Sequence, residues 1–231
     1  MKRVLITGSS RGIGRSIAVK LASKETHMIL HGRDKNALDQ VSKEVEALGS
    51  SAEVIVADLN SLDDIMRLAE CGKSDPIDIL INNAGIASKT EPAVEIDLED
   101  WERVFRVNVT APFLLIKELA PKMTKGSSIV NILSGASYTG YPYWSAYCMS
   151  KFALNGFSKS VREELRADGI RMINIYPGST DTDIWKEIPG EFDRSKMMSP
   201  DCVADTVVMA LKQPENVLVE GVRINNQRST G

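Results

Sequence analysis

The chain has 231 residues, a mass of 25.4 kDa and 43% hydrophobic residues, which is enough for one large α/β domain or two small ones. Its 28 basic and 31 acidic residues leave a net charge of -3 without any block of like charge, which argues against a nucleic-acid partner. No apolar run approaches the ~20 residues that cross a bilayer, no signal peptide precedes the first strand, and the three cysteines have no metal-ligand spacing. We therefore expect a soluble, cytoplasmic protein with no membrane partner and no metal site.

Apolar runs typical of strands alternate with helical patterns along the whole chain, as in a parallel sheet with crossover helices. Strands are predicted at 4–7, 28–31, 53–57, 77–81, 129–133, 171–176 and 216–224. Helices are predicted at 13–24, 35–48, 62–71, 97–124 with a bend at Pro112, 145–167 and 200–211. No linker or repeat interrupts this alternation. The expected fold class is α/β, a single domain over 1–231 built on a doubly wound parallel sheet of about seven strands flanked by helices.

A glycine-rich turn, Thr7-Gly8-Ser9-Ser10-Arg11-Gly12-Ile13-Gly14, joins the first predicted strand to the first helix. Gly8 permits a tight turn, Gly12 lets backbone approach a pyrophosphate, and Gly14 allows close packing of helix on strand. The helix N-terminus then faces the phosphates with its positive end. The spacing differs from the usual Gly-x-Gly-x-x-Gly, and a glycine-rich turn alone can be purely structural. Its place between a strand and a helix indicates a dinucleotide site.

The choice of cofactor can be argued from charge at the end of the second predicted strand. A fold that selects NAD places an acidic residue there for the ribose 2′-hydroxyl, whereas this chain has Gly32 followed by Arg33. A guanidinium pairs with a 2′-phosphate, and Arg11 in the turn can reach the same region. Either arginine alone could be a solvated surface charge. Together they favour NADP(H).

The candidate catalytic residues lie between the fifth strand and the helix that follows it. Tyr147 and Lys151 are four residues apart, so on a helix their side chains share one face. An ammonium near a phenol favours the phenolate, which predicts a lowered Tyr147 pKa and a proton donor or acceptor near neutrality. Ser134 ends the strand thirteen positions earlier. Taken alone, the pair could also be a surface tyrosine packed on a lysine stem.

These motifs, in this order, resemble those of the short-chain dehydrogenase/reductase family, in its compact single-domain branch with a Rossmann-type sheet. The resemblance covers essentially the whole chain. It rests on the glycine-rich turn, Asp58-Leu59, Asn82-Asn83-Ala84-Gly85, Asn108, Ser134, Tyr147-x-x-x-Lys151, and Pro177-Gly178 leading to Thr182.

The resemblance implies a role for each catalytic residue. Tyr147 would be the general acid or base that exchanges a proton with the substrate oxygen, and Ser134 would hydrogen-bond that oxygen. Lys151 would hold the nicotinamide ribose and lower the tyrosine pKa. Asn108 would bind a water that links Lys151 to solvent; its other interpretation is a polar group that satisfies backbone at a helix bend.

The resemblance also implies the residues that bind the cofactor. Asp58 would contact the adenine, with Leu59 alongside, and Asn82, Ala84 and Gly85 would line the adenosine side and brace the fourth strand. Thr180 and Thr182 would meet the carboxamide or the phosphates. The full set is Gly8, Ser10, Arg11, Gly12, Ile13, Gly14, Arg33, Asp58, Leu59, Asn82, Ala84, Gly85, Tyr147, Lys151, Pro177, Gly178, Thr180 and Thr182.

The predicted activity is NADP(H)-dependent interconversion of a small-molecule carbonyl and a secondary alcohol by hydride transfer. The ending Val217 to Ile224 resembles the sepiapterin-reductase-like and hydroxy-acid dehydrogenase branches more than 3-oxoacyl reductases, so these three substrate classes stay open. The alternative from another class is a non-catalytic NADP(H)-binding regulator or scaffold, which would usually lose Ser134, Tyr147 or Lys151.

Two further expectations concern the substrate and the assembly. Residues 180–198 are expected to form a lid, and aromatic side chains before the catalytic helix form either a substrate wall or simple loop packing. The helices ending near Thr124 and Ala167 carry more apolar residues than one sheet face needs. Because family members pair such helices across a two-fold axis, we expect a homodimer or homotetramer.

Overall fold

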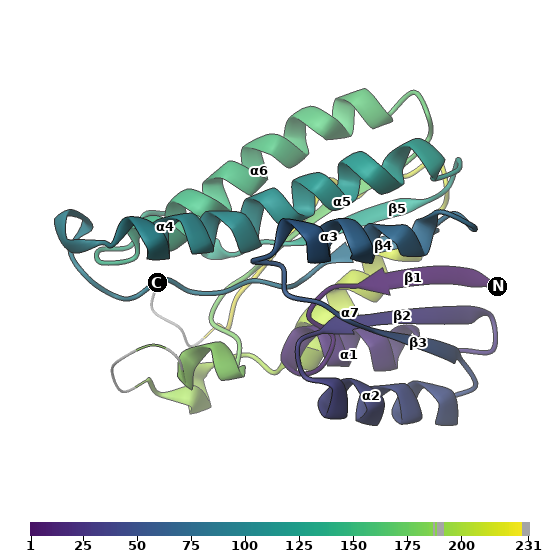
Figure 1. Ribbon diagram of the computed structural model, residues 1–231, viewed down its shortest axis with the longest axis horizontal. Helices are drawn as coiled ribbons and strands as arrows, with labels where there is room; N and C mark the ends of the chain where they lie inside the picture. Colours follow the sequence, from purple (N-terminus) through teal and green to yellow (C-terminus); the bar gives the residue numbers. More distant parts are fainter. Residues whose placement is uncertain (187, 189–191, 228–231) are drawn as a thin grey trace.

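The computed structural model describes residues 1–186, 188 and 192–227, and its centre is one seven-stranded sheet (Figure 1). All neighbouring strands are parallel, in the order β3-β2-β1-β4-β5-β6-β7. This confirms the predicted doubly wound parallel sheet. The strands are β1 Lys2–Ile6, β2 Thr26–Gly32, β3 Ser51–Val56, β4 Ile79–Asn82, β5 Ser128–Ile132, β6 Arg171–Pro177 and β7 Gly221–Ile224.

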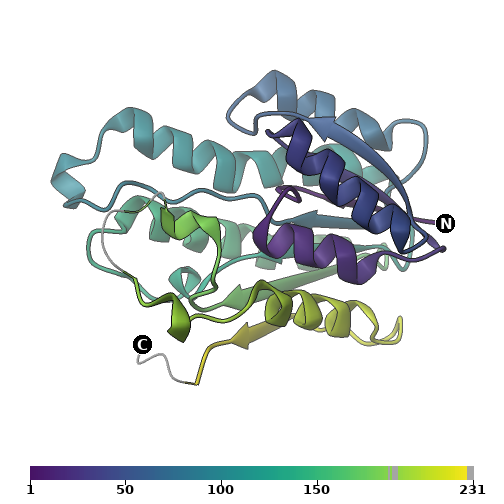
Figure 2. The same ribbon diagram turned by 90° about the horizontal axis from the view of Figure 1, so that it is seen from below.

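Helices cover both faces of the sheet. In Figure 1, α3, α4, α5 and α6 lie on one side of it and α1, α2 and α7 on the other; the turned view of Figure 2 shows the second group in front. None of the described helices is both long and apolar enough to cross a membrane. Their bounds are α1 Gly12–Leu21, α2 Lys35–Ala47, α3 Leu62–Ala69, α4 Leu98–Phe105, α5 Ala111–Leu119, α6 Ser145–Leu165 and α7 Pro200–Leu211.

Each face of the sheet has its own hydrophobic core because side chains alternate along a strand. In β1, Leu5 packs into one core with Ile65 of α3 and helix α5. Its neighbours Val4 and Ile6 belong to the other core, with α1, α2 and α7. A strand that is buried on both faces has a continuous run of apolar residues, and this run allowed the strand to be predicted from sequence.

The start of several helices is fixed by a side chain that caps the first turn. Before α2, the Asp34 side chain accepts a hydrogen bond from the Ala37 backbone at 3.1 Å. Before α3, the Ser61 side chain accepts one from the Asp64 backbone. Ser199 caps α7, whose first residue is Pro200. Short polar side chains satisfy backbone N–H groups that have no partner within the helix, and proline needs none there.

The helical stretch after residue 97 differs from its prediction. Instead of one helix bent at Pro112, α4 and α5 are joined by a wider, π-helical turn at Arg106–Thr110. Pro112 has no N–H to give to the carbonyl of Asn108 four residues earlier, and the Ala111 N–H reaches back to Arg106. The irregularity therefore lies one turn before the proline, and the proline sits in the first turn of α5, where a missing N–H costs little.

The order of the strands determines where the site lies. β1 lies between β2 and β4, so consecutive connections leave it in opposite directions and open a crevice at the carboxyl ends of these strands. The glycine-rich turn follows β1 and the 82–85 motif follows β4. Both therefore lie at the same edge.

Candidate active site

The glycine-rich turn has a backbone that only glycine adopts easily. Gly8 and Gly12 have φ angles of +66° and +55°, in the left-handed region. A Cβ on Gly14 would lie 2.2 Å from the Gly8 carbonyl oxygen, closer than any atom can approach. The backbone of the turn therefore packs directly against the backbone of α1, with no side chain between them. The N-terminus of α1 faces the crevice.

Hydrogen bonds tie this turn to the end of β4. The side-chain amide of Asn83 donates to the carbonyls of Thr7 and Gly8 at 2.9 and 3.0 Å. The Thr7 hydroxyl accepts from the backbone N–H groups of Asn83 and Ala84, both at 3.0 Å. Asn83 was not among the predicted site residues, although its place directly after a strand was the available signal.

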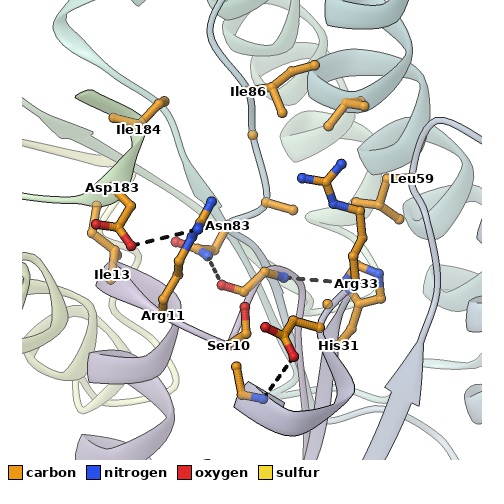
Figure 3. A pocket seen from close by; sticks show the side chains of 18 of the residues that line it. Ser10, Arg11, Ile13, His31, Arg33, Leu59, Asn83, Ile86, Asp183 and Ile184 are labelled. Atoms are coloured by element: carbon orange, nitrogen blue, oxygen red, sulfur yellow. Dashed lines mark hydrogen bonds and ion pairs between the residues drawn. The ribbon is translucent and has the colours of Figure 1, made fainter. Parts of the chain in front are cut away.

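His31 at the end of β2 was also missed, and it supports the turn from below. Its ring is buried, with Nδ1 3.3 Å from the Gly8 backbone nitrogen and Nε2 3.2 Å from the Ala57 carbonyl oxygen (Figure 3). Burial lowers the pKa of His31 to about 4, so the ring is neutral at pH 7. Nε2 then carries the proton and donates to Ala57, while Nδ1 accepts from Gly8.

A cavity of about 320 Å³ opens above the turn. Figure 3 shows the Arg33 guanidinium reaching into it near Leu59, while Arg11 turns toward Asp183, whose carboxylate lies 3.7 Å away. Arg33 forms no hydrogen bond or ion pair with the described residues. Of the predicted cofactor residues, this cavity gathers Gly8, Ser10, Arg11, Gly12, Ile13, Arg33, Asp58, Leu59, Ala84, Gly85 and Thr182.

A second cavity of about 640 Å³ continues from the first. Ile13, Asn83, Gly85, Thr182 and Ile184 line both, so the two form one groove. The second cavity brings together the predicted residues Ser134, Tyr147, Lys151, Pro177, Gly178, Thr180 and Thr182. The predicted lid, 180–198, contributes side chains to it; residues 187 and 189–191 of that segment lie outside the described residues.

Three of the predicted residues, Gly14, Asn82 and Asn108, line neither cavity, and Asn82 is the one predicted to line the adenosine side. Its side chain is buried, and its Nδ2 donates to the Asn131 Oδ1 at 2.9 Å. Because side chains alternate along β4, its last residue points into the sheet and the next one, Asn83, points to the groove. The hydrogen bond to Asn131 agrees with the predicted bracing of the fourth strand, whereas the Asn82 side chain does not line the cavity expected to hold the adenosine.

The three candidate catalytic side chains meet at the floor of the second cavity. Ser134 follows β5, and its hydroxyl lies near that of Tyr147 on α6, close enough to lower the pKa of the phenol. One turn along the same helix, the Lys151 Nζ donates to the Ile132 carbonyl at 3.2 Å and lies 5.7 Å from the Tyr147 ring centre. The i, i+4 spacing thus places both side chains on the face of α6 that lies toward the end of β5.

The protonation of these groups differs from the sequence-based expectation. Burial raises the pKa of Tyr147 to about 12, and the Ser134 hydroxyl lowers it only in part. Burial also lowers the pKa of Lys151 to about 8. The predicted acidification of the phenol by the lysine was therefore wrong for this geometry, because desolvation outweighs a lysine whose ammonium is directed at Ile132. Tyr147 holds its proton at neutral pH.

Asn108 lies in the π-helical turn and holds the loop after β4. Its Oδ1 accepts from the Ile86 backbone N–H at 2.9 Å, and its Nδ2 donates to the Ile86 carbonyl at 2.9 Å and to the Ser150 hydroxyl at 3.0 Å. Ser150 in turn donates to the Tyr147 carbonyl at 2.7 Å. The side chain thus satisfies backbone at a bend and joins that loop to the first turn of α6.

A family model described as short chain dehydrogenase matches residues 2–191. The chain belongs to the short-chain dehydrogenase family. It is an oxidoreductase, in agreement with the motifs and the parallel sheet.

Relatives in this short-chain dehydrogenase family differ in what they act on. A sepiapterin reductase from Chlorobaculum tepidum is 31% identical over 234 residues, which cover 96% of this chain and 95% of that protein. A 3-oxoacyl-[acyl-carrier-protein] reductase from Synechocystis sp. is 31% identical over 231 residues, covering 96% and 93%. The crystal structure of a metagenomic short-chain oxidoreductase in complex with NADP has 30% identity and a TM-score of 0.84, covering 99% of this chain and 98% of that one.

Proposed function

We propose that this enzyme interconverts a carbonyl and a secondary alcohol with NADP(H), with Tyr147 as the general acid and base. The observation that carries the proposal is the pair of neighbouring hydroxyls, Tyr147 and Ser134, which line a 640 Å³ cavity that continues to the glycine-rich turn. A dinucleotide held along that groove would present its nicotinamide to these hydroxyls. When bound, NADPH would supply the hydride for the new C–H bond and become NADP⁺.

The residues along the groove fit the parts of such a cofactor. The turn and the N-terminus of α1 offer backbone N–H groups to the pyrophosphate. The Arg33 guanidinium is positioned for a 2′-phosphate, and Asp58 and Leu59 border the space for the adenine. At the other end, Thr180 and Thr182 lie where they can hydrogen-bond a carboxamide. A structural relative solved with NADP supports the same choice of cofactor.

The two hydroxyls have different roles in the proposed carbonyl reduction. Tyr147 is protonated at neutral pH, as a general acid for reduction must be, and it gives its proton to the substrate oxygen. Ser134 donates a hydrogen bond to the same oxygen while negative charge develops on it. Lys151 lines the same cavity and would hold a ribose hydroxyl of the cofactor, which would keep the nicotinamide near Tyr147. Three unpaired cysteines suit the reducing cytoplasm in which we place the enzyme.

Replacement of the tyrosine separates an enzyme from a regulator that only binds NADP(H). Tyr147→Phe should lower kcat for ketone reduction by about a thousandfold, since general acid catalysis contributes roughly 10²–10⁴. The Kd for NADPH, followed by its fluorescence, should change less than about threefold. Tyr143→Phe is the matched control, because this exposed phenol lies outside both cavities. Tyr147→Phe activity within tenfold of the parent would contradict the proposal.

Arg33 provides the test of cofactor choice. Arg33→Ala should raise the KM for NADPH at least tenfold and leave the KM for NADH within about twofold, because charge-assisted hydrogen bonds contribute about 1.5–3 kcal/mol. Arg166→Ala is the control, since that exposed arginine pairs with Glu163 at the far end of α6. A parent enzyme that uses NADH more efficiently than NADPH would overturn the assignment.

A further inference from the structure

An aromatic surface leads outward from the catalytic tyrosine. The Trp144 ring is 5.7 Å from the Tyr147 ring and 6.1 Å from that of Trp185, and Trp185 lies 4.7 Å from Phe192. The Trp185 indole N–H donates to the Thr180 carbonyl at 2.8 Å, so its polar atom is already satisfied. All four side chains line the second cavity. This wall, Tyr147-Trp144-Trp185-Phe192, offers ring faces and edges suited to a flat ligand.

Two more phenols converge next to Ser134, over Gly135. A Cβ built on Gly135 would lie 3.3 Å from the Tyr141 hydroxyl and 3.8 Å from the Tyr138 hydroxyl. Neither hydroxyl has a hydrogen-bond partner among the described residues, and both side chains line the second cavity. The glycine leaves room for a ligand atom at this point.

The Tyr138 ring is held in place from two sides. The Arg223 guanidinium lies 3.9 Å above its ring centre, and the Tyr176 ring packs against it edge to face at 5.9 Å. Burial raises the pKa of Tyr141, so this phenol is a hydrogen-bond donor at neutral pH. The pair of hydroxyls is thus suited to an oxygen of the substrate other than the one that Ser134 and Tyr147 bind.

The lid segment offers no free positive charge to an anionic substrate. The described residues of 180–198 carry three carboxylates and three basic residues. Each basic residue is paired with a carboxylate of the same segment: Lys186 with Asp183, Arg194 with Asp181, and Lys196 with Asp193. A phosphate-bearing carrier at the mouth would meet no unpaired cation among the described residues of this segment, so an uncharged substrate is favoured.

From these observations we propose that the substrate is an uncharged fused-ring ketone with a second oxygen, its ring lying against Trp144 and Trp185 and its second oxygen bound by Tyr138 and Tyr141. The inference rests on the proposed function and names its substrate class. In the step itself, the ketone carbon gains a hydride from NADPH and the oxygen gains the Tyr147 proton, which gives the secondary alcohol and NADP⁺.

The substrate class can be tested by measuring the rate of NADPH oxidation with four carbonyl compounds. 1-Tetralone has a fused ring and one oxygen, and 4-hydroxy-1-tetralone adds a second oxygen. S-acetoacetyl-N-acetylcysteamine is linear and uncharged, and acetoacetyl-CoA is linear and anionic. We expect kcat/KM for 4-hydroxy-1-tetralone to exceed that for 1-tetralone about tenfold, and both tetralones to exceed the two thioesters at least tenfold, since one aromatic contact or hydrogen bond contributes about 1 kcal/mol.

Two variants test the residues named. The double variant Tyr138→Phe with Tyr141→Phe should bring the ratio of kcat/KM for the two tetralones close to one, whereas Tyr143→Phe should leave that ratio as in the parent. Trp185→Leu should lower kcat/KM for the tetralones about tenfold more than for the uncharged thioester.

The outcomes separate this inference from the function on which it rests. A thioester reduced as well as or better than 1-tetralone overturns the substrate class and leaves carbonyl reduction intact. A tetralone ratio unchanged in the double phenylalanine variant overturns the role of the two phenols. If none of the four ketones is reduced, the substrate class is wrong, and failure of diketones, pterins and β-keto esters as well would overturn the proposed function.

Discussion

Lys151 is a buried cation whose position reduces the stability of the fold. Among the described residues its Nζ has one hydrogen-bond acceptor, the Ile132 carbonyl, and burial lowers its pKa from 10.5 to about 8. Between these two values the unfolded chain binds a proton that the folded chain has lost, so folding stability rises with pH across this window. Below pH 8 the destabilisation is present in full. It amounts to about 3 kcal/mol, at roughly 1.36 kcal/mol for each unit of pKa.

Replacement of this lysine should therefore stabilise the protein while it removes activity. Lys151→Met eliminates the buried charge and loses one hydrogen bond of about 1 kcal/mol, for a net gain in the free energy of unfolding of about 2 kcal/mol at pH 7. Urea denaturation at one protein concentration measures it. The gain should shrink at pH 9.5, where the parent has lost the proton.

The control is Lys159→Met, an exposed lysine on the same helix, which should change the free energy of unfolding by less than about 0.5 kcal/mol. A Lys151→Met variant that is less stable than the parent at pH 7, or equally stabilised at both pH values, would refute this account of Lys151.

At the scale of single residues, sequence predicted which side chains meet but not their ionisation. Ser134, Tyr147 and Lys151 were predictable because helix spacing and a strand end fix their places. His31 was missed because its contact with Gly8 depends on how β1 and β2 lie side by side. The raised Tyr147 pKa was missed because desolvation depends on residues from many segments, which no local pattern reveals.

At the scale of elements, a row of buried asparagines joins the strand ends under the site. Asn82 of β4 donates to Asn131 of β5, which donates to Asn174 of β6 at 3.1 Å. Asn174 then donates to Ser158 on α6 at 2.7 Å. These side chains are fully or almost fully buried, so their hydrogen bonds are made within the protein and fix the helix that carries Tyr147 relative to the sheet.

Sequence patterns predicted the type and order of these elements better than their details. Every predicted strand has its counterpart, and the central strands, which are buried on both faces, leave the clearest apolar runs. The last strand is shorter than predicted, Gly221–Ile224 against 216–224, because β7 lies at the sheet edge and pairs only with β6. The π-helical turn could not be predicted because it depends on the register of backbone hydrogen bonds around Pro112.

At the scale of the whole molecule, the outer helices leave aromatic side chains in solvent. Trp101 and Phe105 of α4, Phe113 of α5 and Phe152 of α6 are each between 37% and 46% exposed. These helices lie on the same side of the sheet in Figure 1, and Phe113 packs edge to face on Phe157 of α6 at 5.7 Å. Apolar surface gathered on adjacent helices is typical of a protein interface.

We propose that this face pairs with a second copy of the chain across a two-fold axis, as part of a homodimer or homotetramer. Sedimentation velocity should then give a mass of at least twice 25.4 kDa at micromolar concentration. Phe152→Asp should shift the protein toward the monomer, because a two-fold axis places the new charge in the interface twice.

Val94→Asp is the matched control. That side chain is 93% exposed and lies in the loop before α4, so the same charge there should leave the mass unchanged. A parent that sediments as a monomer, or a Phe152→Asp variant that keeps the full mass, would show that this face does not pair. α6 carries both Phe152 and Tyr147, the proposed general acid. A variant that dissociates should therefore also lose kcat, because α6 would lose packing on its outer face while the buried asparagines hold only its inner face.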